Sequence, residues 1–181
     1  ADPKIISFAG GMPANSLFPI DVIDELYADL SLSAKQVAMQ YGPTSGYPPL
    51  LSSLEEYMQS RGISLENQKI LITTGAQQAI NLLTKVLVDP GDLVVTEYPS
   101  FIGALAAFMS YGANLCGIPL DNDGINLEEL RNVLDSRASQ IKILYLNPCF
   151  HNPAGIIYSQ QHKQALLELL QGRNLCLLED D

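Results

Sequence analysis

Short apolar runs, separated by Gly, Pro, Asn and Asp, recur along the chain and predict the strands of a buried sheet. They lie at residues 69–73, 93–96, 113–118, 141–146 and 174–178. Longer stretches with apolar residues at helical spacing predict helices at residues 19–30, 48–60, 76–88, 99–111, 127–134 and 159–170. Strands that alternate with helices favour a mostly parallel sheet with helices on its faces, so the expected fold class is α/β, with three α/β/α layers.

Local signals mark where some of these helices begin. Asn126, followed three residues later by Glu129, forms a variant of the capping box. Ile125 and Leu130 flank it as a hydrophobic staple, which predicts a helix with a structural role only. Ser159 is placed to cap the helix that follows it.

The loop at residues 147–155 is the strongest candidate for a ligand site. Asn147 and Asn152 each precede a proline, which holds both residues out of helical conformation. Pro148 and Pro153 cannot donate a ladder hydrogen bond, so the strand at 141–146 ends here. A rigid loop at the carboxyl end of a strand is where open α/β sheets bind ligands, and the Asn152 amide offers both a donor and an acceptor.

Further candidate positions lie near the same predicted edge. Residues 75–77 open a predicted helix, and the free N–H groups and positive dipole of a first turn suit a phosphate. Asp180 ends the last apolar run, and strand alternation sends it to the opposite face from Glu179 and Asp181. The helix and strand between Asn152 and Asp180 form the crossover that brings two adjacent parallel strand ends together. On these residues alone, Asp180 could equally be a solvated strand end.

Composition narrows the class of protein. The chain has 181 residues, 47% hydrophobic content and a formal net charge of −10, which suits a globular core and argues against a nucleic-acid surface. No apolar stretch approaches the roughly 20 residues of a membrane span, and the first residues do not resemble a signal peptide. Cys116, Cys149 and Cys176 form no Cys-x-x-Cys pair and indicate reduced cytosolic thiols. With 2 histidines in the chain, a zinc site at Cys149 and His151 is not expected.

Five motifs, in family order, carry a resemblance that covers nearly the whole chain. Asn152-Pro153-Ala154-Gly155 resembles the Asn-Pro-Thr/Ala-Gly motif of fold-type I pyridoxal phosphate (PLP) enzymes, the aspartate aminotransferase superfamily. Glu179-Asp180-Asp181 matches a second motif of that superfamily. The others resemble the aminoadipate/aromatic aminotransferase subgroup and the aminotransferase-like domain of MocR regulators: Phe8-Ala9-Gly10-Gly11-Met12-Pro13, Gln40-Tyr41-Gly42-Pro43-Thr44-Ser45-Gly46-Tyr47 and Thr73-Thr74-Gly75-Ala76-Gln77-Gln78.

The resemblance implies the PLP cofactor and a role for each matching residue. The PLP phosphate is expected on the first helical turn, Asn152 on the phenolic oxygen of the ring, and Asp180 on the ring nitrogen. Gly11 is expected to contact substrate. The residues expected to hold PLP are Gly75, Ala76, Gln77, Phe101, Asn152 and Asp180, together with Tyr41 reaching across a homodimer interface to the partner's phosphate.

The chain departs from the family pattern at particular positions. Ala76 stands where many relatives have Ser, so one hydroxyl contact is missing. Phe101 stands where Tyr is common and would keep the stacking on the ring. From the residues alone, Phe101 could be a core aromatic, Tyr41 a packing tyrosine and Gly11 part of a plain turn.

The lysine that forms the family's Schiff base with PLP has no counterpart in this chain. In the family it follows Asp180 in a Ser-x-x-Lys motif, whereas the lysines here are Lys4, Lys35, Lys69, Lys85, Lys142 and Lys163. We therefore expect a fragment that shows no transamination alone. Residues 1–45 would supply an N-terminal segment with active-site loops, and residues 46–181 part of the PLP-binding large domain.

The main hypothesis is that the parent protein is a cytoplasmic, homodimeric, PLP-dependent aminotransferase. Its substrates would be an amino acid and a 2-oxo acid, with no nucleic acid bound by this segment and no membrane. The alternative is the effector- or PLP-sensing domain of a MocR/GntR-type transcriptional regulator. A ligand-free scaffold and a carbon–sulfur lyase on the same fold stay open on the sequence.

Overall fold

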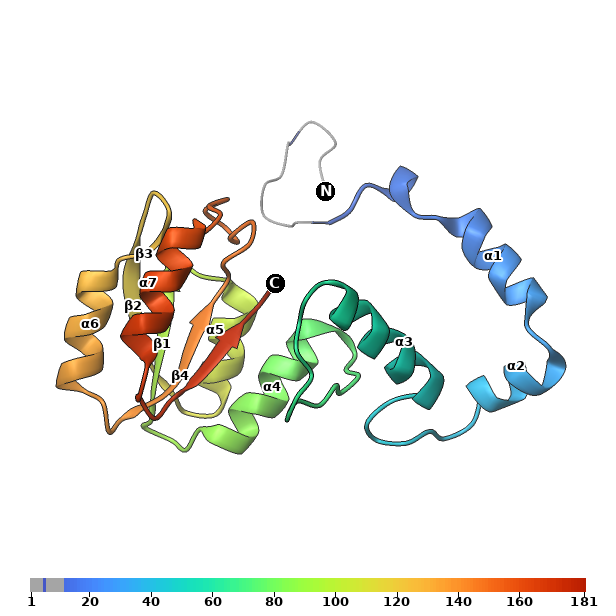
Figure 1. The fold of residues 1–181 in the computed structure, drawn as a ribbon, viewed down its shortest axis with the longest axis horizontal. Helices are drawn as coiled ribbons and strands as arrows, with labels where there is room; N and C mark the ends of the chain where they lie inside the picture. The colour runs from blue at the N-terminus through green and yellow to red at the C-terminus, as the bar shows by residue number, and fades with distance from the viewer. Residues whose placement is uncertain (1–4, 6–11) are drawn as a thin grey trace. The chain divides into compact units, whose positions relative to one another are not determined.

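A computed structural model describes residue 5 and residues 12–181 of the chain (Figure 1). The predicted substrate contact Gly11 lies outside the described residues. The chain divides into two compact units, Ala1–Ile70 and Leu71–Asp181.

The first unit is helical in its described residues. Its elements are the 3-10 turn η1 (Asn15–Leu17) and the helices α1 (Ile20–Asp29), α2 (Leu32–Ala38) and α3 (Pro48–Ser60). The helices predicted at 19–30 and 48–60 are therefore confirmed, whereas α2 was not predicted. Ser31 caps α2 by accepting the Ala34 N–H at 3.2 Å. None of these helices buries a residue, so their apolar faces are exposed.

The second unit alternates helices with the strands of one sheet. Its elements are α4 (Gly75–Leu87), β1 (Leu93–Tyr98), α5 (Ile102–Ser110), β2 (Asn114–Asp121), β3 (Gly124–Ile125), α6 (Leu127–Ser136), β4 (Ile141–Leu146), α7 (Gln160–Leu170) and β5 (Cys176–Glu179). The strand order is β3-β2-β1-β4-β5. All neighbours pair in parallel except the short β3, which pairs antiparallel with β2. The predicted α/β class is confirmed.

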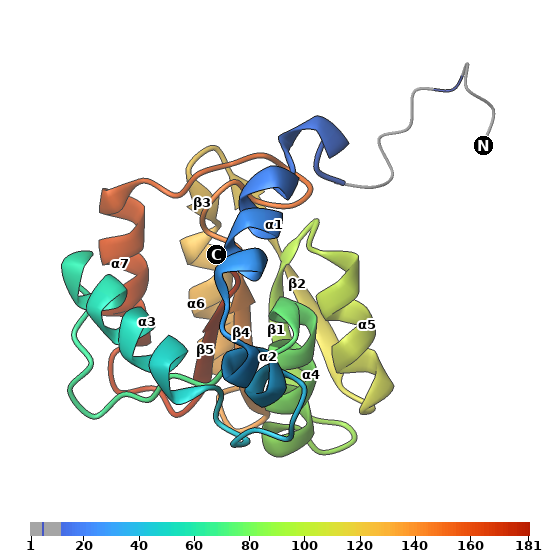
Figure 2. The same ribbon diagram turned by 90° about the vertical axis from the view of Figure 1, so that its right-hand side faces the viewer.

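Helices cover both faces of this sheet, as Figure 2 shows. Strand alternation sends Val95 and Leu144 into a core with α6 and α7, and Val94 and Ile143 into a second core with α4 and α5. All four side chains are fully buried. The expected three-layer arrangement is therefore present, and β1 and β4 form its centre.

The predicted cap of α6 is present in the structure. The Asn126 side chain accepts the Glu129 N–H at 2.8 Å, and Ile125 and Leu130 are both fully buried in the core on that face of the sheet. Ser159 caps α7 in the same way by accepting the His162 N–H at 3.1 Å. These two helix starts follow from local sequence alone.

Two expectations from the sequence differ from the structure. Residues 69–73 were predicted as a strand but form none, because no described strand pairs with them and an isolated strand has no ladder hydrogen bonds. The helix expected from Pro99 begins at Ile102, so Pro99 precedes it and Phe101 takes the N-cap position. This later start leaves Phe101 at the end of the loop that follows β1.

Candidate functional site

A pocket of about 330 Å³ lies at the carboxyl ends of β1, β4 and β5. It is lined by Ala76, Gln77, Phe101, Asn147, Phe150, Asn152 and Asp180. Five of these seven positions are site residues predicted from the sequence, and the fold brings all seven together from four separate segments. Binding at the carboxyl edge of a parallel sheet is the general arrangement of open α/β proteins.

One wall of the pocket is the first turn of α4. Ala76 and Gln77 line it, and Gly75, the first helical residue, does not. Gly75 has φ of +72°, a left-handed conformation that favours glycine and that turns the chain into the helix. N–H groups of a first turn have no acceptor within the helix, and no acidic side chain stands in this turn. This wall therefore suits an anionic group.

Phe101 forms an aromatic wall beside that turn. The Gln77 side-chain amide donates to the Gly103 carbonyl at 2.9 Å, which ties the start of α4 to the start of α5. A Cβ at position 103 would lie 2.5 Å from the Phe101 ring and 2.6 Å from the Gln77 amide oxygen. Glycine at this position thus lets both side chains pack over the backbone, where they face one pocket.

Asn147 connects the two polar residues on the other side of the pocket. Its side-chain oxygen accepts the Asn152 N–H at 2.6 Å, and its side-chain N–H donates to the Asp180 carbonyl. The Asp180 N–H in turn donates to the Leu146 carbonyl at 2.9 Å, which continues the β4–β5 ladder. Asn152 and Asp180 are therefore fixed relative to each other through one side chain.

The Asp180 carboxylate has its own partner in the sheet. The Tyr145 hydroxyl, from β4, donates to Asp180 Oδ2 at 2.6 Å. Burial, followed by the hydrogen bond and charge of Asp180, raises the pKa of Tyr145 above its ordinary value. The phenol therefore stays protonated and acts as a donor, which leaves the other carboxylate oxygen for a ligand.

Sequence reasoning missed Asn147, Phe150 and Tyr145 as site residues. Asn147 was recognised only as a residue that ends a strand, although its polar side chain beside a proline at a strand end was a usable signal. Phe150 is 78% exposed and has φ of +51°, an unusual backbone conformation for a side chain of this kind. Tyr145 lies within an apolar run, so its polar end carried no separate signal.

Tyr41, the remaining predicted cofactor contact, belongs to the first unit. It lies in the loop between α2 and α3, and its side chain is fully exposed, at 101%.

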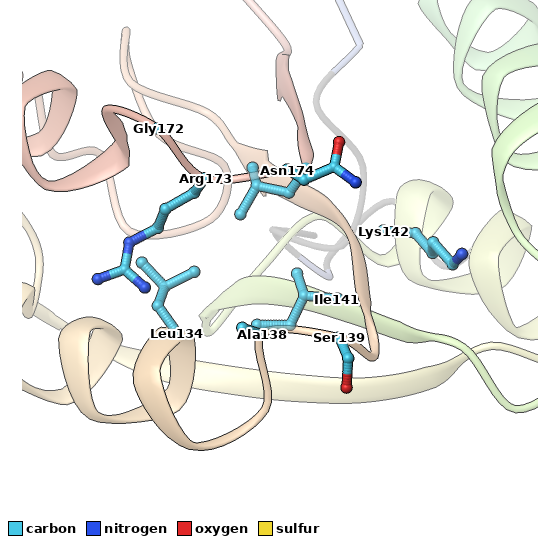
Figure 3. A pocket seen from close by; sticks show the side chains of 9 residues that line it. Leu134, Ala138, Ser139, Ile141, Lys142, Gly172, Arg173 and Asn174 are labelled. Carbon is cyan, nitrogen blue, oxygen red and sulfur yellow. The ribbon is translucent and has the colours of Figure 1, made fainter.

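A larger cavity, of about 510 Å³, lies at the opposite edge of the sheet, where β4 and β5 begin (Figure 3). None of the predicted site residues lines it. Its cations are already paired, Arg173 with Asp135 at 2.7 Å and Lys142 with Asp92 at 3.9 Å. The amino ends of parallel strands are also not where such sheets bind ligands.

The described residues contain neither a cluster of metal ligands nor a membrane-spanning helix. In residue 5 and residues 12–181, no three His, Cys, Asp or Glu side chains gather closely enough to hold a metal ion. No helix in that part of the chain has the length and apolar content needed to cross a membrane. Cys116, Cys149 and Cys176 are free, and each is partly buried.

Known proteins resemble this chain in sequence and in fold. The family model for aminotransferases of class I and II matches residues 4–181. Aromatic-amino-acid aminotransferase 1 of Thermococcus litoralis is 38% identical over 181 residues, which cover 98% of this chain and 43% of the relative. An uncharacterized HTH-type transcriptional regulator of Bacillus subtilis, YdfD, is 34% identical over 181 residues, covering 100% of this chain and 37% of the regulator.

A solved structure agrees with these relatives. LysN, the α-aminoadipate aminotransferase of Thermus thermophilus, was solved with N-(5'-phosphopyridoxyl)-L-leucine and superposes with a TM-score of 0.86 at 39% identity. The match covers 98% of this chain and 44% of LysN. The chain thus spans less than half the length of the proteins it matches. A family model that matches nearly every residue, together with the shared fold, shows that this chain belongs to the class I and II aminotransferase family.

Proposed function

We propose that the whole protein is a PLP-dependent aminotransferase that moves an amino group between an amino acid and a 2-oxo acid. The observation that carries the proposal is the pocket at the strand ends, which combines an anion-binding helix start, an aromatic wall, an amide and a carboxylate. Membership of the aminotransferase family and the pyridoxyl compound bound by LysN support it.

The groups in the pocket fit PLP. Its phosphate suits the N–H groups of Ala76 and Gln77, because a helix N-terminus attracts anions. Its flat ring suits the face of Phe101, which offers stacking without a hydroxyl. The ring nitrogen, which binds a proton, suits the free oxygen of Asp180. The pocket therefore has an electropositive helix start at one end and a carboxylate at the other. These two ends match the phosphate and the protonated ring nitrogen of PLP.

The chain's own residues would orient the cofactor and hold one proton. When bound, PLP supplies an electron sink for the carbanion that forms at the amino acid Cα. Asp180 would keep the proton on the ring nitrogen, and Asn152 would donate its amide N–H to the phenolic oxygen. Gly75 shapes the turn that presents Ala76 and Gln77. The absence of any lysine among the pocket residues means that the covalent attachment would need a lysine from elsewhere in the whole protein.

Titration of the whole protein with PLP tests the proposal. We expect a saturable change in PLP absorbance, and amino-group transfer from an amino acid to a 2-oxo acid in the loaded protein. Matched assays with the 2-oxo acid omitted control for simple release of ammonia. A protein that binds PLP and only eliminates or releases ammonia would contradict the aminotransferase proposal.

We also propose that the whole protein is a homodimer and that Tyr41 reaches the phosphate held by the partner subunit. Its full exposure in a loop supports a role in contacting something outside the unit. Tyr41→Phe, which removes one hydroxyl, is expected to weaken PLP binding about tenfold. Equilibrium titration measures this, with the half-exposed Tyr27→Phe as a matched control. Unchanged affinity, or an active protein that is strictly monomeric, would refute the assignment.

A second candidate is the sensing domain of a MocR/GntR-type regulator. The HTH-type regulator YdfD matches every part of this chain, and this chain corresponds to 37% of YdfD. The net charge of −10 disfavours DNA binding by this segment itself, so a separate domain would have to bind DNA. Sequencing the gene on both sides of this segment distinguishes the two candidates, since a regulator would encode a helix-turn-helix domain before it.

Two assignments rest on the family resemblance. We propose that Gly11 contacts the substrate, and that residues 1–45 form an N-terminal segment while residues 46–181 belong to the large domain. We place the protein in the cytoplasm, which its three free cysteines support. A role in amino acid metabolism follows from the proposed aminotransferase activity. Fluorescence imaging of the tagged whole protein tests the location.

A further inference from the structure

We infer that Glu97 is a positioning residue that, together with His151 and Tyr158, holds the cofactor-binding loop through the backbone of Asn147. The inference rests on the proposed function only for its consequence, PLP binding. None of these three residues lines the pocket, so they would act on it through residues that do. Neither the strand pattern nor any recognised motif assigns them a role.

The three side chains are a polar cluster in the interior. Glu97 is 1% exposed, His151 2% and Tyr158 3%. A carboxyl group in this environment is costly unless its oxygens are hydrogen-bonded. Burial raises the pKa of Glu97, and hydrogen bonds and the neighbouring His151 counteract that rise only in part. Such a group is retained at a cost in stability, which is typical of a residue with a specific role.

Each oxygen of Glu97 meets groups from the loop that follows β4. Oε1 accepts the Tyr158 hydroxyl at 2.6 Å, and Oε2 accepts the Asn147 N–H at 3.0 Å. His151 Nε2 lies 3.1 Å from Oε2, close enough for attraction although it is not aligned as a hydrogen bond. The partners are 50 and 61 positions away in sequence, so Glu97 joins β1 to both ends of the loop.

The protonation of His151 follows from its second nitrogen. Nδ1 accepts the Ala154 N–H at 3.1 Å, so it carries no proton. The ring proton is therefore placed on Nε2, which lies 3.1 Å from Glu97 Oε2. The ring thus links Glu97 to the turn at Ala154, within the segment that carries Asn152.

The effect on the pocket passes through Asn147. Glu97 fixes its backbone N–H, while the Asn147 side chain fixes the Asn152 N–H and the Asp180 carbonyl. The loop is closed at its base by the Tyr158 N–H, which donates to the Pro148 carbonyl at 2.9 Å. A disturbance at Glu97 should therefore displace the two side chains that we propose contact opposite edges of the PLP ring.

The decisive variant is Glu97→Gln in the whole protein. Glutamine keeps the size of the side chain, but one oxygen becomes an NH₂ group. That group must face either the Tyr158 hydroxyl or the Asn147 N–H, and the second case sets two donors against each other. Tyr158→Phe is a milder second variant, because it removes one hydroxyl and keeps the buried ring.

Two measurements separate positioning from general stability. In the PLP-free protein, amide hydrogen exchange in residues 147–158 is expected to become about tenfold faster or more in both variants. In titrations, the dissociation constant for PLP is expected to rise by a similar factor. Leu134→Ala is the matched control, because Leu134 is 1% exposed in the core that also holds the Tyr158 ring but is not one of the three polar residues. This control should lower thermal stability without changing either readout.

The outcomes distinguish this inference from the proposed function. Unchanged exchange in residues 147–158 in both variants would overturn the positioning role, whether or not PLP binds. Faster exchange with unchanged PLP affinity would overturn the link from Glu97 to the pocket. If Leu134→Ala weakened PLP binding as much as Tyr158→Phe at equal loss of stability, the cluster would be ordinary core. A wild-type protein that does not bind PLP would refute the proposed function, while the exchange result would still decide the role of Glu97.

Discussion

Replacing Asp180 by asparagine in the whole protein is expected to leave PLP bound but to lower kcat by about 10- to 150-fold. Under the proposed function, the carboxylate would hold the proton on the ring nitrogen by a charge-assisted hydrogen bond, which is worth roughly 1.5–3 kcal/mol. Asparagine is of similar size and can keep a neutral hydrogen bond, but it has no charge to retain that proton. The loss should therefore fall on turnover rather than on binding.

The surroundings of Asp180 make this substitution a clean test. Tyr145 donates to one carboxylate oxygen at 2.6 Å, and the asparagine side-chain oxygen can accept the same bond. The Asp180 backbone is held in the β5 ladder by Leu146, and this contact does not depend on the side chain. The fold should therefore be retained in the variant.

Steady-state kinetics and PLP titration of Asp180→Asn measure the two effects separately. Glu179→Gln is the matched control, because the neighbouring Glu179 is an exposed acid at the end of β5 and does not line the pocket. This variant also removes one negative charge near the pocket. It should leave kcat within twofold of wild type, because solvent and salt screen an exposed charge. An unchanged turnover number for Asp180→Asn would show that Asp180 is only a strand end.

Phe108→Ala is expected to lower the free energy of unfolding by about 3–5 kcal/mol, the range for a fully buried aromatic side chain. Phe108 is 0% exposed, on the face of α5 that packs against Val94 and Ile143. Its ring also meets the Tyr145 ring edge to face, with centroids 5.5 Å apart. The truncation therefore removes both buried apolar area and a specific aromatic contact, and it leaves a cavity at the centre of the sheet.

Urea unfolding of the whole protein, followed by circular dichroism, measures this loss. Met109→Ala is the control on the next residue, which is 55% exposed and should change stability by no more than about 0.5 kcal/mol. Phe108→Leu fills most of the cavity, so we also expect it to recover stability. It still lacks the ring that packs on Tyr145, the donor to Asp180, so we do not expect the full kcat to return. A loss below 1 kcal/mol for Phe108→Ala would mean that the core around α5 collapses to fill the space.

The pocket at the strand ends was largely predictable because its parts are local. Asn152 and Asp180 each follow an apolar run, and residues 75–77 open an amphipathic helix, so each could be recognised within its own segment. The parallel crossover rule then placed the two strand ends at one edge. The structure shows Ala76, Gln77, Phe101, Asn152 and Asp180 around a single pocket.

The contacts that hold the pocket were not predictable in this way. Glu97 looked like a polar residue after a strand, and nothing near it in sequence shows that its carboxyl group is buried. Its partners Asn147 and Tyr158 lie 50 and 61 residues away, and such pairings depend on the register of β1 against β4. Asn147 was read as a strand terminator for the same reason, since its two side-chain partners are brought to it only by the folded loop.

The sequence by itself determined the elements whose signals lie within one turn or one strand. These are the caps at Asn126 and Ser159, the apolar runs of β1, β2, β4 and β5, and the break after Leu146. Only the tertiary structure decided which neighbours each element found. Residues 69–73 carry a strand-like pattern but form no strand in the described chain. They have no strand to pair with there, and a strand is stable only when it is paired. Glu97 became the centre of a buried polar cluster because two distant donors and the His151 ring surround it, and long-range contacts of that kind leave no local pattern in the sequence.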